Sequence, residues 1–162
     1  MSFDPDKFRQ TLRRFGSGVT VVSAGHEGRL HGATASAFCS LSATPALILV
    51  CLDLKSNTKT IIDQVGYFGV NILADVQRPV SDLFARKTMD PDEIAKLRHH
   101  HTENDVPILD DSLAWIECRV HAHYPGGDHE IYVGEVLGAD VRTARPLWYY
   151  DGKYRRMGGE MT

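Results

Sequence analysis

Residues 113–124 alternate between apolar and polar side chains, and this period of two limits the fold more than any other feature of the chain. One face of the segment is apolar, with Ile116, Cys118, Val120 and Ala122. The other face is polar, with Glu117, Arg119, His121 and His123. Such alternation is typical of an antiparallel strand that packs one face on a core and leaves the other in water. It favours an antiparallel barrel or an α+β fold over a doubly wound parallel sheet.

The remaining segments fit the same architecture, because β-branched and apolar runs dominate and no βαβ rhythm repeats along the chain. Further strands are expected at residues 19–23, 30–36, 46–52 and 67–74, and around Ile131, Val133 and Leu137. Short helices are expected from a cap at Ser56 or Asn57 to Gly66, and over residues 80–87. Asp151-Gly152 predicts a hairpin turn. We therefore expect a mainly β (α+β) fold with short flanking helices, in one domain over residues 1–162.

The chain begins with signals for another helix. Asp4 is a suitable N-cap, Pro5 suits the first turn, and Gly16 is suited to end the helix. Phe3 and Phe8 are spaced to form a hydrophobic staple across the cap. Helical spacing also relates three apolar side chains, which we expect to pack on the core: Phe8, Leu12 and Phe15.

Composition excludes several classes of protein. A net charge of −3 and a pI near 6.2 give no support to nucleic-acid binding. The longest apolar run, residues 46–52, is too short to span a bilayer, and the N-terminus lacks the pattern of a signal peptide. The three cysteines have no Cys-x-x-Cys spacing, which favours reduced thiols over disulfides or a zinc site. We expect a cytoplasmic protein without a membrane or nucleic-acid partner.

Two runs of small, hydrogen-bonding residues flank the apolar strand at residues 46–52. The first covers residues 34–42, and the second covers residues 53–58. The second run places Lys55 beside an expected helix N-terminus, where anions are favoured. Together the runs could form a cradle for a flat ligand with a phosphate tail. The alternative is two ordinary turns around a core strand, with the second run acting only as a helix cap.

Several blocks, in their order along the chain, resemble the short-chain flavin reductases, which supply reduced flavin to two-component monooxygenases. These blocks are residues 8–22, 34–42, 68–74 with Gln77, 127–129 and 145–154. None is specific alone, but their combined order is, and they extend over nearly the whole chain. The resemblance implies an FMN-binding split β-barrel, and a homodimer with flavin sites near the subunit interface.

The resemblance also implies which residues bind ligands. Its flavin-binding positions are Thr34, Ala35, Ser36, Ala37, Ser40 and Cys51. On the phosphate side it implies Asp53, Lys55, Ser56, Asn57 and Thr58. Arg86 could supply a second cation, although an exposed arginine at a helix end is the alternative. Three positions are assigned to the nicotinamide: His129, Tyr150 and Gly152. A histidine beside Asp128 can hold one tautomer and orient its ring.

Five histidines raise the question of a metal site: His99, His100, His101, His121 and His123. No carboxylate or cysteine completes a recognised ligand spacing, so we interpret residues 99–101 as a solvated helix end and expect no metal. The chain also departs from the family here. Residues 93–97 stand where family members commonly have an Arg-Phe or Lys-Phe pair, which leaves open what covers the dimethylbenzene side of the flavin.

We therefore predict an NAD(P)H-dependent flavin reductase that passes reduced flavin to a partner monooxygenase. Hydride transfer between stacked rings depends on positioning and requires no general acid, so no catalytic residue is assigned. Two alternatives remain. One is an enzyme of the same fold that keeps its flavin and reduces another substrate, such as a corrin or quinone. The other is a flavin-binding protein without activity. The residues do not distinguish FMN from FAD or NADH from NADPH.

Overall fold

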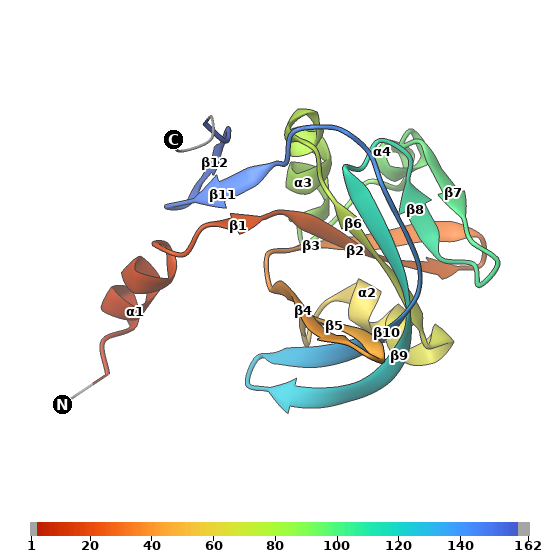
Figure 1. Cartoon of the computed structure of the whole chain (residues 1–162), viewed down its shortest axis with the longest axis horizontal. Helices are drawn as coiled ribbons and strands as arrows, with labels where there is room; N and C mark the ends of the chain where they lie inside the picture. Colours follow the sequence, from red (N-terminus) through yellow and green to blue (C-terminus); the bar gives the residue numbers. More distant parts are fainter. Residues whose placement is uncertain (1–2, 159–162) are drawn as a thin grey trace.

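In the computed structural model, which describes residues 3–158, a seven-stranded antiparallel sheet forms the body of the protein (Figure 1). Its strands are β2 (Thr20–His26), β3 (Arg29–Ala35), β4 (Phe38–Ala43), β5 (Ala46–Asp53), β6 (Tyr67–Ile72), β9 (Ala114–Gly126) and β10 (His129–Val141). Their order across the sheet is β3-β2-β6-β9-β10-β5-β4. The strand-dominated fold inferred from the alternating pattern is therefore confirmed.

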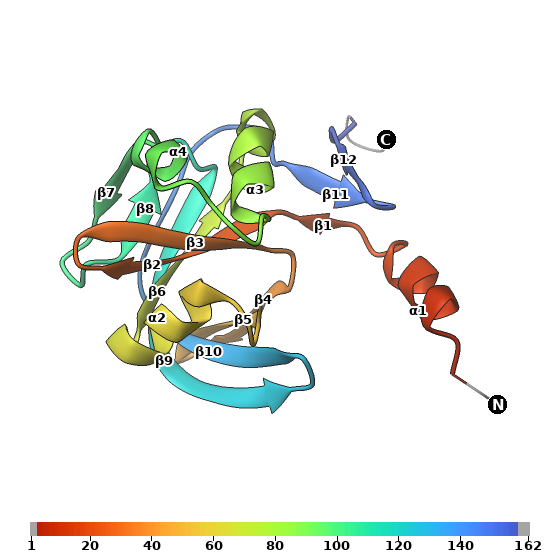
Figure 2. The same cartoon turned by 180° about the vertical axis from the view of Figure 1, so that it is seen from behind.

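The two edge strands of this sheet are neighbours in sequence. Only Ser36 and Ala37 connect β3 to β4, yet the two strands lie at opposite ends of the strand order. A connection this short requires the sheet to curl until its edges approach each other. Within residues 3–158 no ladder joins β3 to β4, so the curled sheet stays open, as in a split barrel. The β3–β4 connection lies at this opening (Figure 2).

The long strand β9 departs from the expected alternation at one position. Glu117 was assigned to the solvent face, but it is only 8% exposed. Its carboxylate accepts hydrogen bonds from the Thr102 hydroxyl at 2.7 Å and from the Asn104 amide at 2.9 Å. The loop after residue 101 therefore covers this face of the strand, which the local pattern could not indicate.

Helix α2 (Asn57–Val65) covers one part of the sheet and α3 (Arg78–Phe84) another (Figures 1 and 2). Ser56 caps α2, and Gly66 ends it in the left-handed conformation, both as expected. Two core clusters result, one around Ile62, Phe68 and Tyr132, the other around Leu73, Phe84 and Leu147. Two short segments follow β6, namely η1 (Asp75–Gln77) and α4 (Pro91–Ala95). None of the helices in residues 3–158 is long and apolar enough to cross a membrane.

Helix α1 (Pro5–Leu12) stands away from the sheet (Figures 1 and 2). The Asp4 cap and the Phe3–Phe8 staple are confirmed, with the two rings 5.6 Å apart. The helix ends at Leu12 rather than near Gly16. The expected core packing is wrong, because Phe8 and Leu12 on the helix and Phe15 just beyond it are exposed at 50%, 55% and 81%. Helical spacing identifies an apolar face, but it does not specify what covers that face.

Two small sheets complete the fold. In the first, β1 (Ser17–Gly18), β11 (Trp148–Tyr150) and β12 (Lys153–Arg155) pair in the order β1-β11-β12. The Asp151-Gly152 turn between β11 and β12 is confirmed, with φ values of 52° and 73°. In the second, β7 (His99–His101) pairs with β8 (Pro107–Leu109), so the expected helix end at residues 99–101 is wrong. The fully buried β8 provides a pairing partner that the histidine run alone could not reveal.

Candidate functional site

The ladder between β5 and β10 brings two of the predicted binding segments together. Asp53, at the end of β5, lies opposite His129, at the start of β10. One residue further, the Leu54 N–H donates to the carbonyl oxygen of Asp128 at 3.1 Å. The turn at residues 127–129 therefore sits beside the segment that leads into α2. Residues 53–54 and 128–129, more than seventy residues apart in sequence, therefore lie side by side at the end of the β5–β10 ladder.

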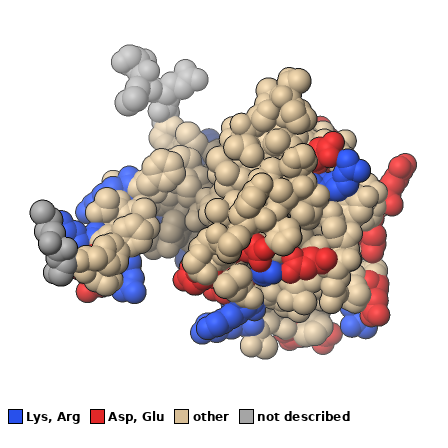
Figure 3. All heavy atoms as spheres, turned by 90° about the horizontal axis from the view of Figure 1, so that it is seen from below, with Lys and Arg blue, Asp and Glu red and all other residues tan. Residues whose placement is uncertain are grey.

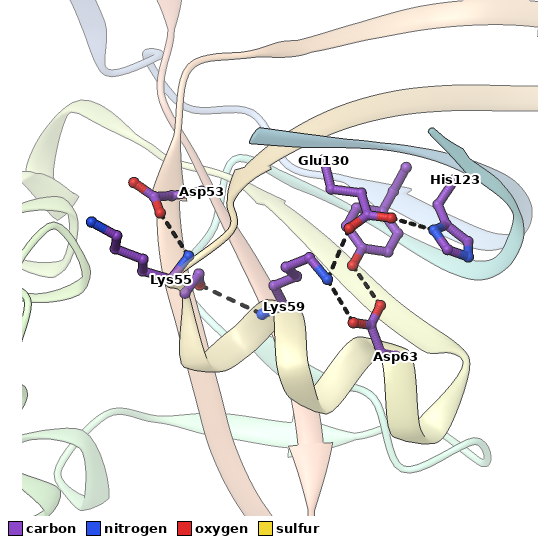
Figure 4. Close-up of polar contacts among 8 residues, drawn as sticks. Asp53, Lys55, Lys59, Asp63, His123 and Glu130 are labelled. Carbon is purple, nitrogen blue, oxygen red and sulfur yellow. Dashed lines mark hydrogen bonds and ion pairs between the residues drawn. The ribbon is translucent and has the colours of Figure 1, made fainter. Parts of the chain in front are cut away.

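The N-terminus of α2 presents part of the expected phosphate side (Figure 4). Asp53 accepts a hydrogen bond from the Lys55 N–H at 2.7 Å, which fixes the turn before the helix. Lys55 and Asn57 are exposed, and Ser56 is half-buried with its oxygen 3.5 Å from the Lys59 N–H. Thr58 is only 1% exposed, so it belongs to the core rather than to an open anion site. These donors and the cation suit a phosphate group.

The segment predicted to contact the flavin ring, residues 34–42, contains both buried and accessible positions. The Thr34 hydroxyl donates to the Ser81 carbonyl at 2.8 Å, and Ala35 is 8% exposed, so both serve the packing of β3. Ser36 and Ala37 are exposed in the β3–β4 connection, and Ser40 is exposed on β4. The Cys51 N–H donates to the Ala37 carbonyl at 3.1 Å, which ties this connection to β5.

A groove of about 550 Å³ opens beside the β3–β4 connection. Its lining includes Ser36, Ala37 and Leu49 from the sheet, and Phe15 and Tyr149 from the N- and C-terminal segments. Small residues on one wall let a planar group approach the backbone, and apolar side chains on the others suit the faces of a ring. The groove therefore fits a flat, mainly apolar ligand.

His129 has the orientation that its neighbour predicts. Its Nδ1 lies 2.7 Å from Oδ1 of Asp128, and because a carboxylate only accepts, Nδ1 carries the proton. The pKa of the Asp128 carboxyl is lowered, chiefly by this hydrogen bond and also by the charge of nearby Lys55. The His129 side chain is 44% exposed. The ring is therefore accessible to a bound molecule.

Three other predicted residues lie apart from His129. Figure 1 shows the β11–β12 hairpin, with Tyr150 and Gly152, above the β3–β4 connection, while the β9–β10 turn lies below it. The hairpin rests on the N-terminal segment, since the Asp151 N–H donates to the Arg13 carbonyl at 3.0 Å. Arg86 forms an exposed ion pair with Glu93 at 2.6 Å, which matches its alternative reading as an ordinary arginine at a helix end.

Sequence reasoning missed a charged network between α2 and the β9–β10 hairpin (Figure 4). The Lys59 ammonium lies 2.7 Å from Asp63 and 2.9 Å from Glu130. The Tyr132 hydroxyl donates to Asp63 at 2.6 Å, and His123 pairs with Glu130. Burial and the hydrogen bond to Asp63 raise the pKa of Tyr132. Hydrogen bonds from Lys59 and His123 lower the pKa of Glu130. Only the spacing of Lys59 and Asp63, one helical turn apart, was visible in the sequence.

The three histidines of β7 pair with oxygen atoms, His99 with the Leu97 carbonyl at 2.8 Å. Nδ1 of His100 lies 2.7 Å from Asp110, and Nδ1 of His101 lies 2.5 Å from Asp105. In the part of the chain that the structure describes, no three His, Cys, Asp or Glu side chains converge as metal ligands would.

Flavin reductases are among the known proteins with similar sequences and structures. A family model described as flavin reductase like domain matches residues 12–158. The chain is 40% identical over 151 residues to the reductase component of a 4-nitrophenol 4-monooxygenase/4-nitrocatechol 2-monooxygenase from Rhodococcus opacus, covering 93% of this chain and 80% of the relative. It is 36% identical over 156 residues to an NADH-dependent flavin reductase from a Rhodococcus species, covering 94% and 86%.

The solved structures agree. Flavin reductase PheA2 in its native state superposes with a TM-score of 0.88 at 31% identity, covering 97% of this chain and all of that one. The NADH:FAD oxidoreductase SgcE6 of Streptomyces globisporus C-1027, in complex with NAD and FAD fragments, superposes with a TM-score of 0.90 at 28% identity, covering 100% and 99%. The chain thus belongs to the flavin reductase like family.

Proposed function

We propose that this protein is an NADH-dependent flavin reductase that releases reduced flavin to a partner monooxygenase. The observation that carries the proposal is the junction of two segments: the donor-rich N-terminus of α2 and the Gly127–His129 turn meet at the end of the β5–β10 ladder. Two relatives support the same activity. One is named as the reductase component of a monooxygenase, and the other as an NADH-dependent flavin reductase.

The phosphate of the flavin would bind at the N-terminus of α2. Lys55 supplies the cation, and Ser56 and Asn57 supply polar donors together with unpaired N–H groups of the first helical turn. Lys59 does not serve this purpose, because its ammonium already contacts two carboxylates. The buried Thr58 would support the helix rather than the ligand.

The flavin ring would lie along the β3–β4 connection, where Ser36 and Ala37 leave the backbone accessible. Flavin supplies the hydride acceptor when it is bound. The protein aligns the two rings. It would hold the flavin by the flavin's phosphate and polar edge, and His129 would orient the nicotinamide through Nε2. Asp128 keeps the His129 ring in one orientation by accepting its Nδ1 proton. No protein acid is needed for hydride transfer.

A homodimer is part of the proposal. The apolar side chains of α1 are exposed, and Leu12 and Phe15 line the same groove as Ser36 and Ala37. A second copy seated on this surface would bury the apolar face of α1 and close the groove. The C-terminal hairpin, with Tyr150 and Gly152, flanks the groove and would take part in that closure.

NADH oxidation by purified protein, measured with and without added FMN or FAD, tests the proposed function. A flavin reductase should consume NADH in proportion to added flavin and saturate with it. If the flavin instead stays bound through gel filtration and added flavin changes nothing, the protein keeps its flavin and reduces another substrate. Flavin binding without NADH consumption would mean that the protein only binds flavin.

A further inference from the structure

The network of Lys59, Asp63, Glu130, Tyr132 and His123 joins the two segments of the proposed site. Glu130 follows His129 directly on β10, and side chains alternate between the two faces of a strand. Glu130 and Tyr132 therefore point toward α2, where they meet Lys59 and Asp63 (Figure 4). His129 points to the other face. The network thus attaches the start of β10 to α2 through one face of the strand. His129, on the opposite face, takes no part in these contacts.

The Lys59–Glu130 pair at the centre of the network is well shielded compared with other ion pairs of the protein. The side chains of Lys59 and Glu130 are each 14% exposed, and the ring of His123 stacks on Tyr132 with centroids 5.9 Å apart. Between β9 and β10, the side chains of the Arg119–Glu135 pair are 55% and 34% exposed. A shielded pair that loses one partner leaves an uncompensated charge, whereas an exposed pair contributes little. The shielded network therefore favours a single arrangement of α2 against β10.

We propose that Lys59 and Glu130 are positioning residues that set where the His129 turn lies relative to the N-terminus of α2. This inference rests on the proposed function, in which α2 anchors the flavin phosphate and His129 orients the nicotinamide. The network fixes the relative position of these two anchors. The relative position of the anchors in turn determines how the nicotinamide stacks on the flavin. Because hydride transfer depends steeply on geometry, a small shift of the turn is sufficient to slow it.

The test compares Glu130→Gln with Glu135→Gln, which removes the same charge from the same strand, β10, but from the exposed Arg119–Glu135 pair. Stopped-flow reduction of bound flavin is measured against NADH concentration, and flavin affinity is titrated separately. For Glu130→Gln we expect at least about a fivefold loss in the efficiency of reduction by NADH. Its flavin affinity should stay within about twofold of wild type, since the phosphate anchors are untouched. Glu135→Gln should match wild type in both measurements.

Lys59→Met and the double variant Lys59→Met with Glu130→Gln test whether the two residues act together. If the two residues act as a unit, the double variant should lose no more efficiency than the more impaired single variant. If Glu130→Gln does not fold, His123→Ala provides a milder test, because it removes one partner of Glu130 and leaves Lys59 in place. It should lower efficiency in the same direction with flavin affinity retained.

Two outcomes would overturn the inference. The first is a folded Glu130→Gln variant with a wild-type dependence on NADH. The second is a parallel loss of stability and flavin affinity with unchanged reduction of the flavin that remains bound, which would make the network purely structural. A wild-type protein that consumes no NADH with any flavin would instead contradict the proposed function itself, so the two failures are distinguishable.

Discussion

The two ends of the proposed site differ in how completely a single chain builds them. At the α2–β10 end, the Lys59–Glu130 pair is shielded from solvent, and Ile62 and Tyr132 are fully buried. At the α1 end, the groove is lined by Leu12 and Phe15, which remain largely exposed. A site whose polar groups are all partnered within one chain can hold a ligand without a second subunit. Surface that is left apolar and exposed is completed by something else, for which we propose a second copy.

The phosphate end should show the largest effect on ligand binding. Lys55→Met combined with Ser56→Ala removes a cation and a hydroxyl donor, each worth about 1.5–3 kcal/mol toward a charged group. Flavin affinity should fall at least tenfold, by roughly 1.4 kcal/mol or more. Fluorescence titration of flavin measures it, with Lys153→Met in the C-terminal hairpin as the control. Wild-type affinity in the folded double variant would place the phosphate elsewhere.

Lys59→Met tests whether the shielded network stabilises the fold. It leaves Asp63 and Glu130 facing each other without their shared cation, and the free energy of unfolding should fall by about 2 kcal/mol. Arg9→Met removes the exposed Arg9–Asp6 pair of α1 and should cost less than about 0.5 kcal/mol. Urea denaturation of both variants gives the comparison. Equal losses would remove the distinction between the two ends of the molecule.

The exposed end should govern assembly. Light scattering during gel filtration should give the wild-type protein a mass of twice 18.0 kDa, and Leu12→Ser with Phe15→Ser should shift it toward one chain. Val141→Ser, at another exposed apolar position, should leave the mass unchanged. A wild-type monomer would contradict the proposed dimer. A dimer that survives the double substitution would place its interface on another surface.

The free energy of unfolding should fall modestly at acid pH, because the carboxylates around Lys59 become protonated. The pKa values of Asp63 and Glu130 lie below their ordinary values in the folded protein, so ionised carboxylates favour folding. That contribution is complete above their ordinary pKa values near 4 and is lost as the pH falls below them. The free energy of unfolding should thus decline as the pH falls from about 5 toward 3. Glu130→Gln should flatten the decline, and Glu103→Gln, in an exposed loop, should not.

Local signals in the sequence predicted much of this fold. The cap at Ser56, the left-handed Gly66 and the Asp151-Gly152 turn depend on neighbouring residues only, so they could be assigned without the structure. The family resemblance supplied the expected site residues, and the β5–β10 ladder brings Asp53 and His129 together. In these places local chemistry, the resemblance and the fold agree.

Features that depend on distant parts of the chain escaped sequence analysis. The His99–His101 run became a strand because β8 pairs with it. Thr34 and Thr58 were indistinguishable from exposed binding residues, since only the fold shows that the Thr34 hydroxyl bonds to α3 and that Thr58 is buried. The Lys59–Glu130 contact joins a helix to a strand seventy residues later. Side-chain partners of this kind follow from tertiary packing alone.

His129→Ala tests whether the turn beside α2 positions the nicotinamide. Stopped-flow reduction is recorded against NADH concentration while flavin affinity is titrated separately. We expect a higher apparent KM for NADH or slower flavin reduction, by up to about a hundredfold for a displacement near 1 Å, with flavin affinity nearly unchanged. Flavin reduction at the wild-type rate, with an unchanged dependence on NADH, would contradict it.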